Sequence, residues 1–211
     1  MLRLVLLALI VSAPAVAAQT TFSVRAGVSA LEARFANDER FNSPTLAKDA
    51  RLGLTTGVLA AIPVSSVFSL RPGVNYSQKG YRVSSNAAGL GGSSTLGADY
   101  LEVPLLAGLR VSRSQTFDAT LELGPVLGYR VRTVQDCSGE FEAECEGFDY
   151  SDDLRDVEVG GVFGFALGSG PFGVDVRYVT SLARVDKEDV LDFGDVEFSG
   201  LSASARLTFG R

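Results

Sequence analysis

The stretch FDATLELGPVLGYRVRT, residues 117–133, decides the fold because its side chains alternate in character along an unusually long segment. Apolar residues such as Leu121 and Leu123 occupy one parity, whereas charged residues such as Glu122 and Arg130 occupy the other. A period of two indicates a β-strand whose two faces meet different surroundings. Strands in globular proteins usually have about five or six residues. A strand of this length therefore indicates surroundings that favour long strands.

The same alternation recurs in seven further segments, separated in turn by short turns and by long polar connections. Short turns rich in Gly, Pro and Ser force neighbouring strands to run antiparallel. The sequence therefore predicts eight antiparallel strands in one domain. They are expected near residues 20–36, 50–62, 67–84, 99–112, 117–133, 155–168, 172–185 and 197–209.

Two barrel types fit this pattern, and they differ in which face is buried. A soluble lipocalin-like barrel hides its apolar face inside, whereas a membrane barrel turns that face towards lipid and keeps a polar interior. The polar parity here is rich in glycine and in charges of both signs, which suits a crowded interior. Unpaired strand edges are not tolerated in lipid, so the sheet must close. We therefore predict an all-β fold, an eight-stranded antiparallel up-and-down transmembrane β-barrel.

The predicted interior of this barrel holds a network of charged side chains, which fills the lumen and pairs opposite charges, with Arg110 opposite Asp118 as one example. A gated polar pathway is the alternative interpretation of the same residues. Barrels of eight strands leave little interior room for a channel. The predicted network consists of Arg51, Arg71, Lys79, Glu102, Arg110, Asp118, Glu122, Arg130, Arg132, Glu158, Asp175, Arg177 and Arg206.

Aromatic residues recur on the apolar parity near the ends of the strands, as in the girdles that mark the two membrane interfaces of such barrels. One phenylalanine lies at the lower end of each ascending strand, and tyrosines lie further up the same face. The predicted girdles are Phe22, Phe68, Phe117, Phe172 and Phe209 at one interface, and Tyr76, Tyr129 and Tyr178 at the other.

The first 18 residues resemble a secretory signal peptide, with Arg3 before an apolar run from Leu4 to Val11 and small residues at 15–17. The apolar run is shorter than the roughly 20 residues that a membrane-spanning helix needs. We expect cleavage after Ala17 or Ala18, which leaves the barrel domain at 19–211 and changes the formal charge from −6 to −7, since Arg3 is removed.

Composition excludes several functions. The chain has no histidine, which removes the usual general base and the commonest metal ligand, and we expect no enzyme and no cofactor. Its negative charge argues against a nucleic-acid partner. Cys137 and Cys145 are expected to form a disulfide after export, with thiolate metal ligation as the alternative.

Two predicted loops, residues 134–153 and 186–196, are strongly acidic. Carboxylate oxygens suit Ca²⁺ or Mg²⁺, but the spacing matches no EF-hand, so a repelling, well-solvated surface is the competing interpretation. No metal site is predicted beyond a weak possibility at Glu142, Glu144, Glu146 and Asp149.

Three segments resemble the PorT-like outer-membrane β-barrel domain family, the porin-like small barrels of Bacteroidota and their relatives. They are NYSQKGYRV at 75–83, DYLEVPLLAGLRV at 99–111 and LELGPVLGYRV at 121–131. The resemblance covers residues 20–211 and implies an eight-stranded outer-membrane barrel with no agreed chemistry. Phe209 stands third from the end, where such barrels usually end on an aromatic residue.

These observations predict a protein of the cell outer membrane, exported through the periplasm, with both termini periplasmic and the acidic loops outside. Its partners are expected to be outer-membrane lipid, the barrel-assembly machinery during insertion, and a surface partner at loops 134–153 and 186–196. The predicted role is structural or interactive: membrane integrity, adhesion or partner docking. A narrow porin for small solutes is the alternative, and a soluble periplasmic ligand-binding barrel is a third class.

Overall fold

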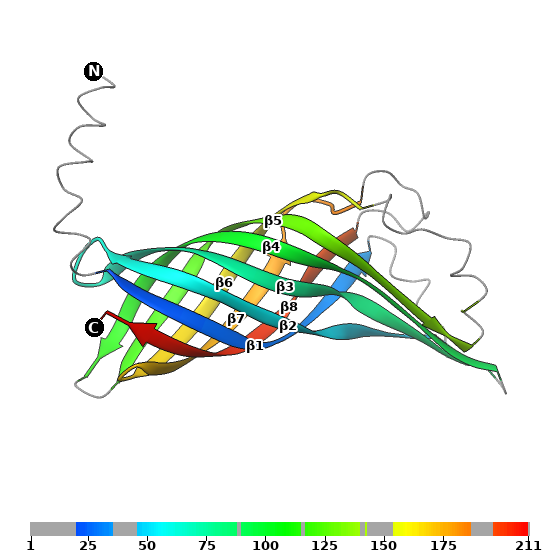
Figure 1. Cartoon of the computed structure of the whole chain (residues 1–211), viewed down its shortest axis with the longest axis horizontal. Helices are drawn as coiled ribbons and strands as arrows, with labels where there is room; N and C mark the ends of the chain where they lie inside the picture. Colours follow the sequence, from blue (N-terminus) through cyan, green and yellow to red (C-terminus); the bar gives the residue numbers. More distant parts are fainter. Residues whose placement is uncertain are drawn as a thin grey trace, which may run out of the picture.

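The structure is a computed structural model, and it describes residues 20–35, 46–87, 90–114, 117–139, 142, 154–186 and 196–210. Eight strands pair antiparallel in sequence order, and the last pairs with the first, so the sheet closes into a barrel (Figure 1). The strands are β1 (Thr21–Phe35), β2 (Leu46–Pro63), β3 (Phe68–Ala87), β4 (Leu90–Arg113), β5 (Asp118–Ser138), β6 (Val157–Ser169), β7 (Phe172–Ser181) and β8 (Val196–Phe209).

One end of the barrel, called the turn end below, carries the short connections between β2 and β3, β4 and β5, and β6 and β7, together with both ends of the described chain (Figure 1). The opposite end is called the loop end. In the short β6–β7 connection, the chain reverses direction at Gly170, which has φ +55°, and Pro171 follows it. Glycine adopts this conformation easily, and both residues are common in tight turns. The carbonyl oxygen of Pro171 accepts a hydrogen bond from Thr208 of β8 at 2.7 Å.

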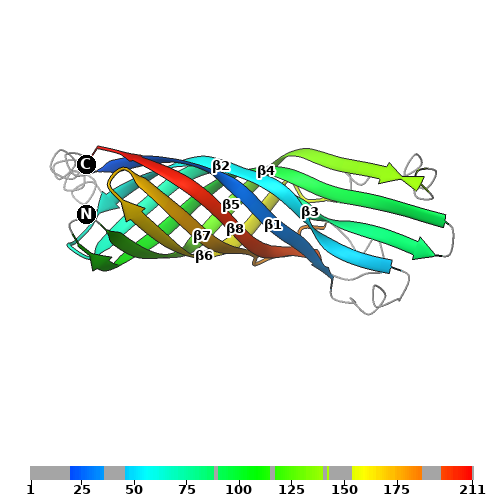
Figure 2. The ribbon, with the colours of Figure 1, turned by 90° about the horizontal axis from the view of Figure 1, so that it is seen from below.

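At the loop end, β2 to β5 continue beyond the other strands and form a projecting sheet (Figure 2). β3 and β4 have 20 and 24 residues, whereas β6 and β7 have 13 and 10. β3 and β4 stay paired up to Ala87 and Leu90. The sequence prediction was wrong for residues 85–87 and 90–98, which it placed in a long polar connection and which belong to β3 and β4. Pairing with neighbouring strands overrides the weak local preference of such a polar segment.

The outer face of the barrel is apolar, as the alternation predicted. The phenylalanines near the turn end are exposed on this face, with 60% of Phe22 and 69% of Phe172 accessible. Tyr129 is also exposed, whereas Tyr76 and Tyr178 are half-buried. Such a surface is costly in water and favourable against acyl chains. Exposed large apolar residues from all eight strands include Val24, Leu54, Val74, Leu105, Leu123, Phe163, Val176 and Leu201.

None of the described residues forms a helix long and apolar enough to cross a membrane.

Candidate functional site

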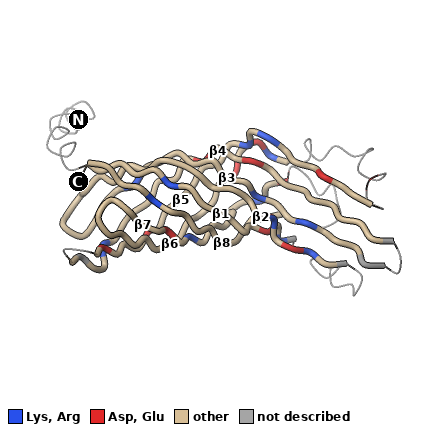
Figure 3. The backbone as a smooth tube through the Cα atoms, turned by 60° about the horizontal axis from the view of Figure 1, so that its bottom comes forward, with Lys and Arg blue, Asp and Glu red and all other residues tan. Residues whose placement is uncertain are grey.

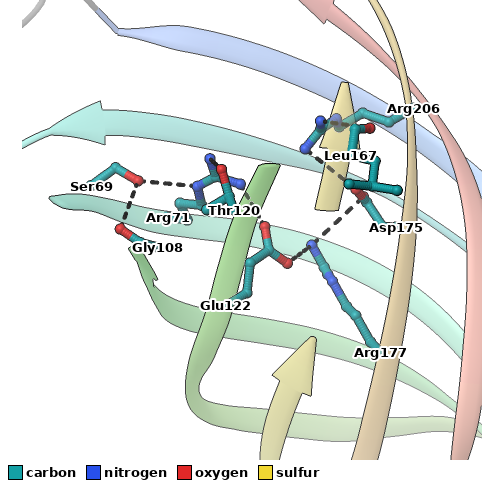
Figure 4. Close-up of polar contacts among 9 residues, drawn as sticks. All are labelled: Ser69, Arg71, Gly108, Thr120, Glu122, Leu167, Asp175, Arg177 and Arg206. Atoms are coloured by element: carbon teal, nitrogen blue, oxygen red, sulfur yellow. Dashed lines mark hydrogen bonds and ion pairs between the residues drawn. The ribbon is translucent and has the colours of Figure 1, made fainter. Parts of the chain in front are cut away.

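The interior near the turn end holds a chain of five ion-paired side chains, called the Glu122 cluster below (Figure 4). Glu122 of β5 lies between two arginines, with 2.6 Å to Nη1 of Arg71 and 2.7 Å to Nη2 of Arg177. Arg177 also lies 3.8 Å from Asp175, which in turn lies 3.3 Å from Nη1 of Arg206. Four strands thus contribute to one continuous network. Shared pairing of this kind compensates charges that would be very costly alone in a buried place.

A second ionic group lies closer to the loop end and is called the Lys79 cluster. The Nζ atom of Lys79 lies 2.8 Å from Glu102 and 2.9 Å from Glu158, and only 1% of the lysine side chain is exposed. Ser181 donates a hydrogen bond of 2.5 Å to Glu158. The lysine also lies 4.9 Å from the ring centre of Tyr100, a cation–π geometry. These contacts link β3, β4, β6 and β7 across the interior.

Apolar side chains close the interior at two further levels, which the sequence prediction missed. Between the ionic groups, Leu106, Val126 and Val162 form a small buried cluster on β4, β5 and β6. Above the Lys79 cluster lies a larger group, called the loop-end plug. It consists of Ala33, Tyr81, Ala98, Tyr100, Leu154, Val185, Val196 and Phe198.

The loop-end plug is fastened by two short segments outside the strands. Leu154 forms an isolated β-bridge with Asp186, and the amide of Arg155 donates to the carbonyl oxygen of Val185 at 2.7 Å. Val185 in turn donates to Val196 of β8 at 2.9 Å. These bonds hold the apolar side chains of Leu154 and Val185 against the aromatic rings inside the barrel. The described segments 154–156 and 182–186 therefore cover the mouth at the loop end.

Eight of the thirteen residues predicted for the interior network lie in the two ionic clusters: Arg71, Lys79, Glu102, Glu122, Glu158, Asp175, Arg177 and Arg206.

Two more of these predicted residues lie near the turn end. Arg110 is half-buried and donates to the carbonyl oxygen of Ser66 in the β2–β3 turn at 3.0 Å. The predicted alignment of Arg110 with Asp118 is wrong, because a register shift between β4 and β5 places Arg110 opposite Thr120 and Asp118 opposite Arg113.

The other three lie towards the loop end, where further register shifts interrupt the alternation. Arg51 reaches Asp99 at 3.4 Å, and Asp99 also accepts a hydrogen bond from Tyr76. Arg130 pairs with Asp156 at 2.7 Å. Arg132 is exposed. A strict period of two in the sequence does not predict such bulges, which shift the following side chains to the other face of the sheet.

Arg25 is, like Asp99, a buried charge that the sequence analysis did not name. It alternates with Val24 and Ala26, so the parity rule alone would have placed it inside. Its side chain is buried, with 4% exposed, and its Nε and Nη1 atoms have no hydrogen-bond partner among the described residues. No ion pair joins Arg25 to any described carboxylate.

Several predictions fall largely outside the described residues. The signal peptide at 1–18 does so entirely, and so do Cys145, Glu144, Glu146 and Asp149. Cys137 is described at the end of β5, where its sulfur lies 3.3 Å from Oγ of Ser94. The disulfide stays a prediction. Within the described ranges, no group of three potential metal ligands occurs.

The comparisons agree with this architecture. The family model for the outer membrane protein β-barrel domain matches residues 17–187. This chain belongs to that family. It is therefore a protein of the outer membrane, and the soluble periplasmic barrel is excluded. The finer resemblance to PorT-like barrels stays a prediction.

Solved structures similar to this chain share little sequence identity with it, and one of them is the outer membrane protein OprG. Neisserial surface protein A is 14% identical, with 89% of this chain and 97% of that chain covered and a TM-score of 0.46. The attachment invasion locus protein Ail of Yersinia pestis is 12% identical, with coverages of 90% and 99% and a TM-score of 0.41. OprG of Pseudomonas aeruginosa is 12% identical, with coverages of 90% and 95% and a TM-score of 0.46. No curated protein matches the chain significantly.

Proposed function

We propose that this protein is a non-conducting outer-membrane barrel with a structural or surface-interaction role. The observation that carries the proposal is the filling of the interior at successive levels. The Glu122 cluster, the apolar cluster around Val126, the Lys79 cluster and the loop-end plug follow one another from the turn end to the loop end. A solute would have to break ion pairs and displace packed aromatic rings to pass.

If the interior is closed, the parts that can meet other molecules lie outside it. The projecting sheet supports a role at the cell surface, because four strands extend beyond the rest at the end that carries the long connections (Figure 2). Charged positions lie along the barrel body and also at this end (Figure 3). We assign partner docking to this sheet together with loops 134–153 and 186–196. No catalytic role is assigned, since the chain contains no histidine.

Conductance separates this role from that of a narrow porin. The refolded full-length barrel is placed in planar bilayers at neutral pH in 1 M KCl, with a known porin of similar preparation as the positive control. We expect no stepwise current, because a passing ion would have to break the ion pairs and displace the packed apolar side chains at these levels. Regular steps of uniform size that depend on the protein would favour the narrow porin instead.

A shortened barrel tests the surface role. Residues 84–93 are replaced by Asn-Gly, so that Val83 and Ser94, which face each other in the β3–β4 ladder, are joined by a two-residue hairpin. A deletion strain is complemented with either the full or the shortened protein, and adhesion and detergent resistance are measured. If the shortened protein restores detergent resistance but not adhesion, the result supports surface interaction. If the full protein restores neither property, the result contradicts the proposal.

A further inference from the structure

Arg25 is a buried cation without a counter-ion of its own, and this sets it apart from the other arginines of the interior. It faces Arg206 directly across the β1–β8 pair, and Arg206 is itself engaged with Asp175 at 3.3 Å. Like charges opposite each other on neighbouring strands are destabilising. A buried guanidinium whose N–H groups lack acceptors is also costly, and such groups in folded proteins are usually satisfied by a water or an ion.

The charges of the two clusters balance Arg25 in number, but none of their carboxylates forms an ion pair with it. The Glu122 cluster has three arginines and two carboxylates, which leaves one positive charge, and the Lys79 cluster has one lysine and two carboxylates, which leaves one negative charge. Asp118, half-buried at the turn end, lies close to Arg206, since both side chains reach the space beside Gly168. It therefore offsets the positive surplus of the Glu122 cluster, and the negative charge left on the Lys79 cluster balances Arg25 in number but makes no ion pair with it. Arg25 remains unpaired.

The wall around Arg25 offers small residues and a second polar group. Arg25 is opposite Gly57, and Gly57 is opposite Asn75, so that the three residues form one row across β1, β2 and β3. The Oδ1 atom of buried Asn75 has no hydrogen-bond partner and lies over Gly57. The two ends of an amide are distinguished only by their hydrogen bonds. Turned over, Asn75 would present its Nδ2–H group to the same space.

We propose that Arg25 binds a small monovalent anion, chloride, inside the barrel, with the turned-over amide of Asn75 as a second donor. The guanidinium supplies the charge and the free N–H groups of Nε and Nη1. An anion accepts charge-assisted hydrogen bonds from these donors and gives Arg25 the local ion pair that it lacks, whereas a water accepts only weaker, neutral hydrogen bonds. The ion reaches this level from the turn end, because the loop-end plug covers the opposite mouth.

Bromide, a heavier halide, tests the site directly. The refolded full-length barrel is crystallised in sodium bromide, and anomalous scattering is measured at the bromine edge. We expect a peak within hydrogen-bonding reach of Arg25 Nε or Nη1. A map with peaks only at surface arginines would overturn the proposal, and so would one in which Arg25 pairs with Glu102 and no halide is present. This measurement needs no variant, so it does not depend on a mutant that folds.

Stability in different salts provides the second arm. The unfolding temperature of the full-length barrel is compared in sodium chloride and sodium gluconate at equal ionic strength. A ligand that binds only the folded state raises this temperature, so we expect a higher value in chloride. Arg25→Met and Asn75→Leu should reduce or abolish the difference, whereas Arg110→Met, at the β2–β3 turn, should keep it. Equal unfolding temperatures of the unaltered barrel in both salts would overturn the proposal, independently of any surface role.

Discussion

Lys79 and Glu158 form an ion pair of 2.9 Å in the interior of the barrel, although 79 positions separate them in the chain. The pair joins β3 to β6, which are not neighbours in the sheet. Because Lys79 also holds Glu102 of β4, one ammonium group ties together three strands. The ionic clusters therefore act as cross-braces through the interior, in addition to the hydrogen bonds around the wall.

Removal of the central cation tests this bracing. Lys79→Met leaves two carboxylates buried side by side without their shared partner. Breaking a buried pair by deleting one member costs about 3–5 kcal/mol, so we expect a clear loss in the free energy of unfolding, measured by urea titration in lipid vesicles. The triple variant Lys79→Met, Glu102→Gln, Glu158→Gln should recover much of that loss. If the triple variant is no more stable than the single one, charge compensation is not the reason for the cluster.

Glu122 is the key anion of the other cluster. Glu122→Ala leaves Arg71 and Arg177 without their carboxylate, so we expect destabilisation of a similar 3–5 kcal/mol. Glu32→Ala is the matched control, because its contact with Arg34 is long, at 3.8 Å, and exposed. That change should stay within about 0.5 kcal/mol. Stability is followed by the temperature at which folded migration is lost on gels.

The same Glu122→Ala variant distinguishes bracing from gating. Conductance in planar bilayers should stay at the baseline, because the loop-end plug still covers the mouth. Opening of the barrel by this single change would indicate that the Glu122 cluster is a gate.

The loop-end plug makes its own prediction. Phe198 is almost fully buried and meets Tyr100 edge-on, with ring centres 6.4 Å apart. Phe198→Ala leaves a cavity that the stiff barrel wall cannot fill, at a cost of about 3–5 kcal/mol. Phe209→Ala, on the outer face at the turn end, should cost less. A calorimetric scan of both variants compares them, and equal losses would show that the plug is loosely packed.

How far the sequence predicts this structure depends on the level considered. Alternation such as that of Leu121, Glu122 and Leu123 is enough for the strands, the closed barrel and the orientation of its two faces. The ion-pair partners of Glu122 are harder to predict from the sequence, because they depend on the stagger between strands and not on parity. Arg71 and Arg177 meet Glu122 only after the barrel closes with its particular register.

Two features of the interior could not be predicted from alternation. The first is the set of bulges, which moves Arg132 to an exposed position opposite Asp99. The second is the pair of apolar clusters. Leu106 and Val126 occupy the polar parity, where an apolar side chain looks like an exception to the rule. Only the packing of these exceptions against one another shows that the interior is partly dry.

The orientation of the apolar face underlies every other prediction, and arginine substitutions on that face test it. Leu123 lies on β5 with 62% of its surface exposed, midway along the barrel wall, whereas Leu52, with 80% exposed, lies close to the projecting sheet. A charged side chain on the lipid face costs about 2–4 kcal/mol at the bilayer midplane and about 0–1 kcal/mol near an interface. Leu123→Arg should therefore destabilise the barrel in lipid vesicles much more than Leu52→Arg. If both positions faced water, arginine would be tolerated at either one. An unchanged or higher free energy of unfolding for Leu123→Arg would therefore mean that this face does not contact hydrocarbon.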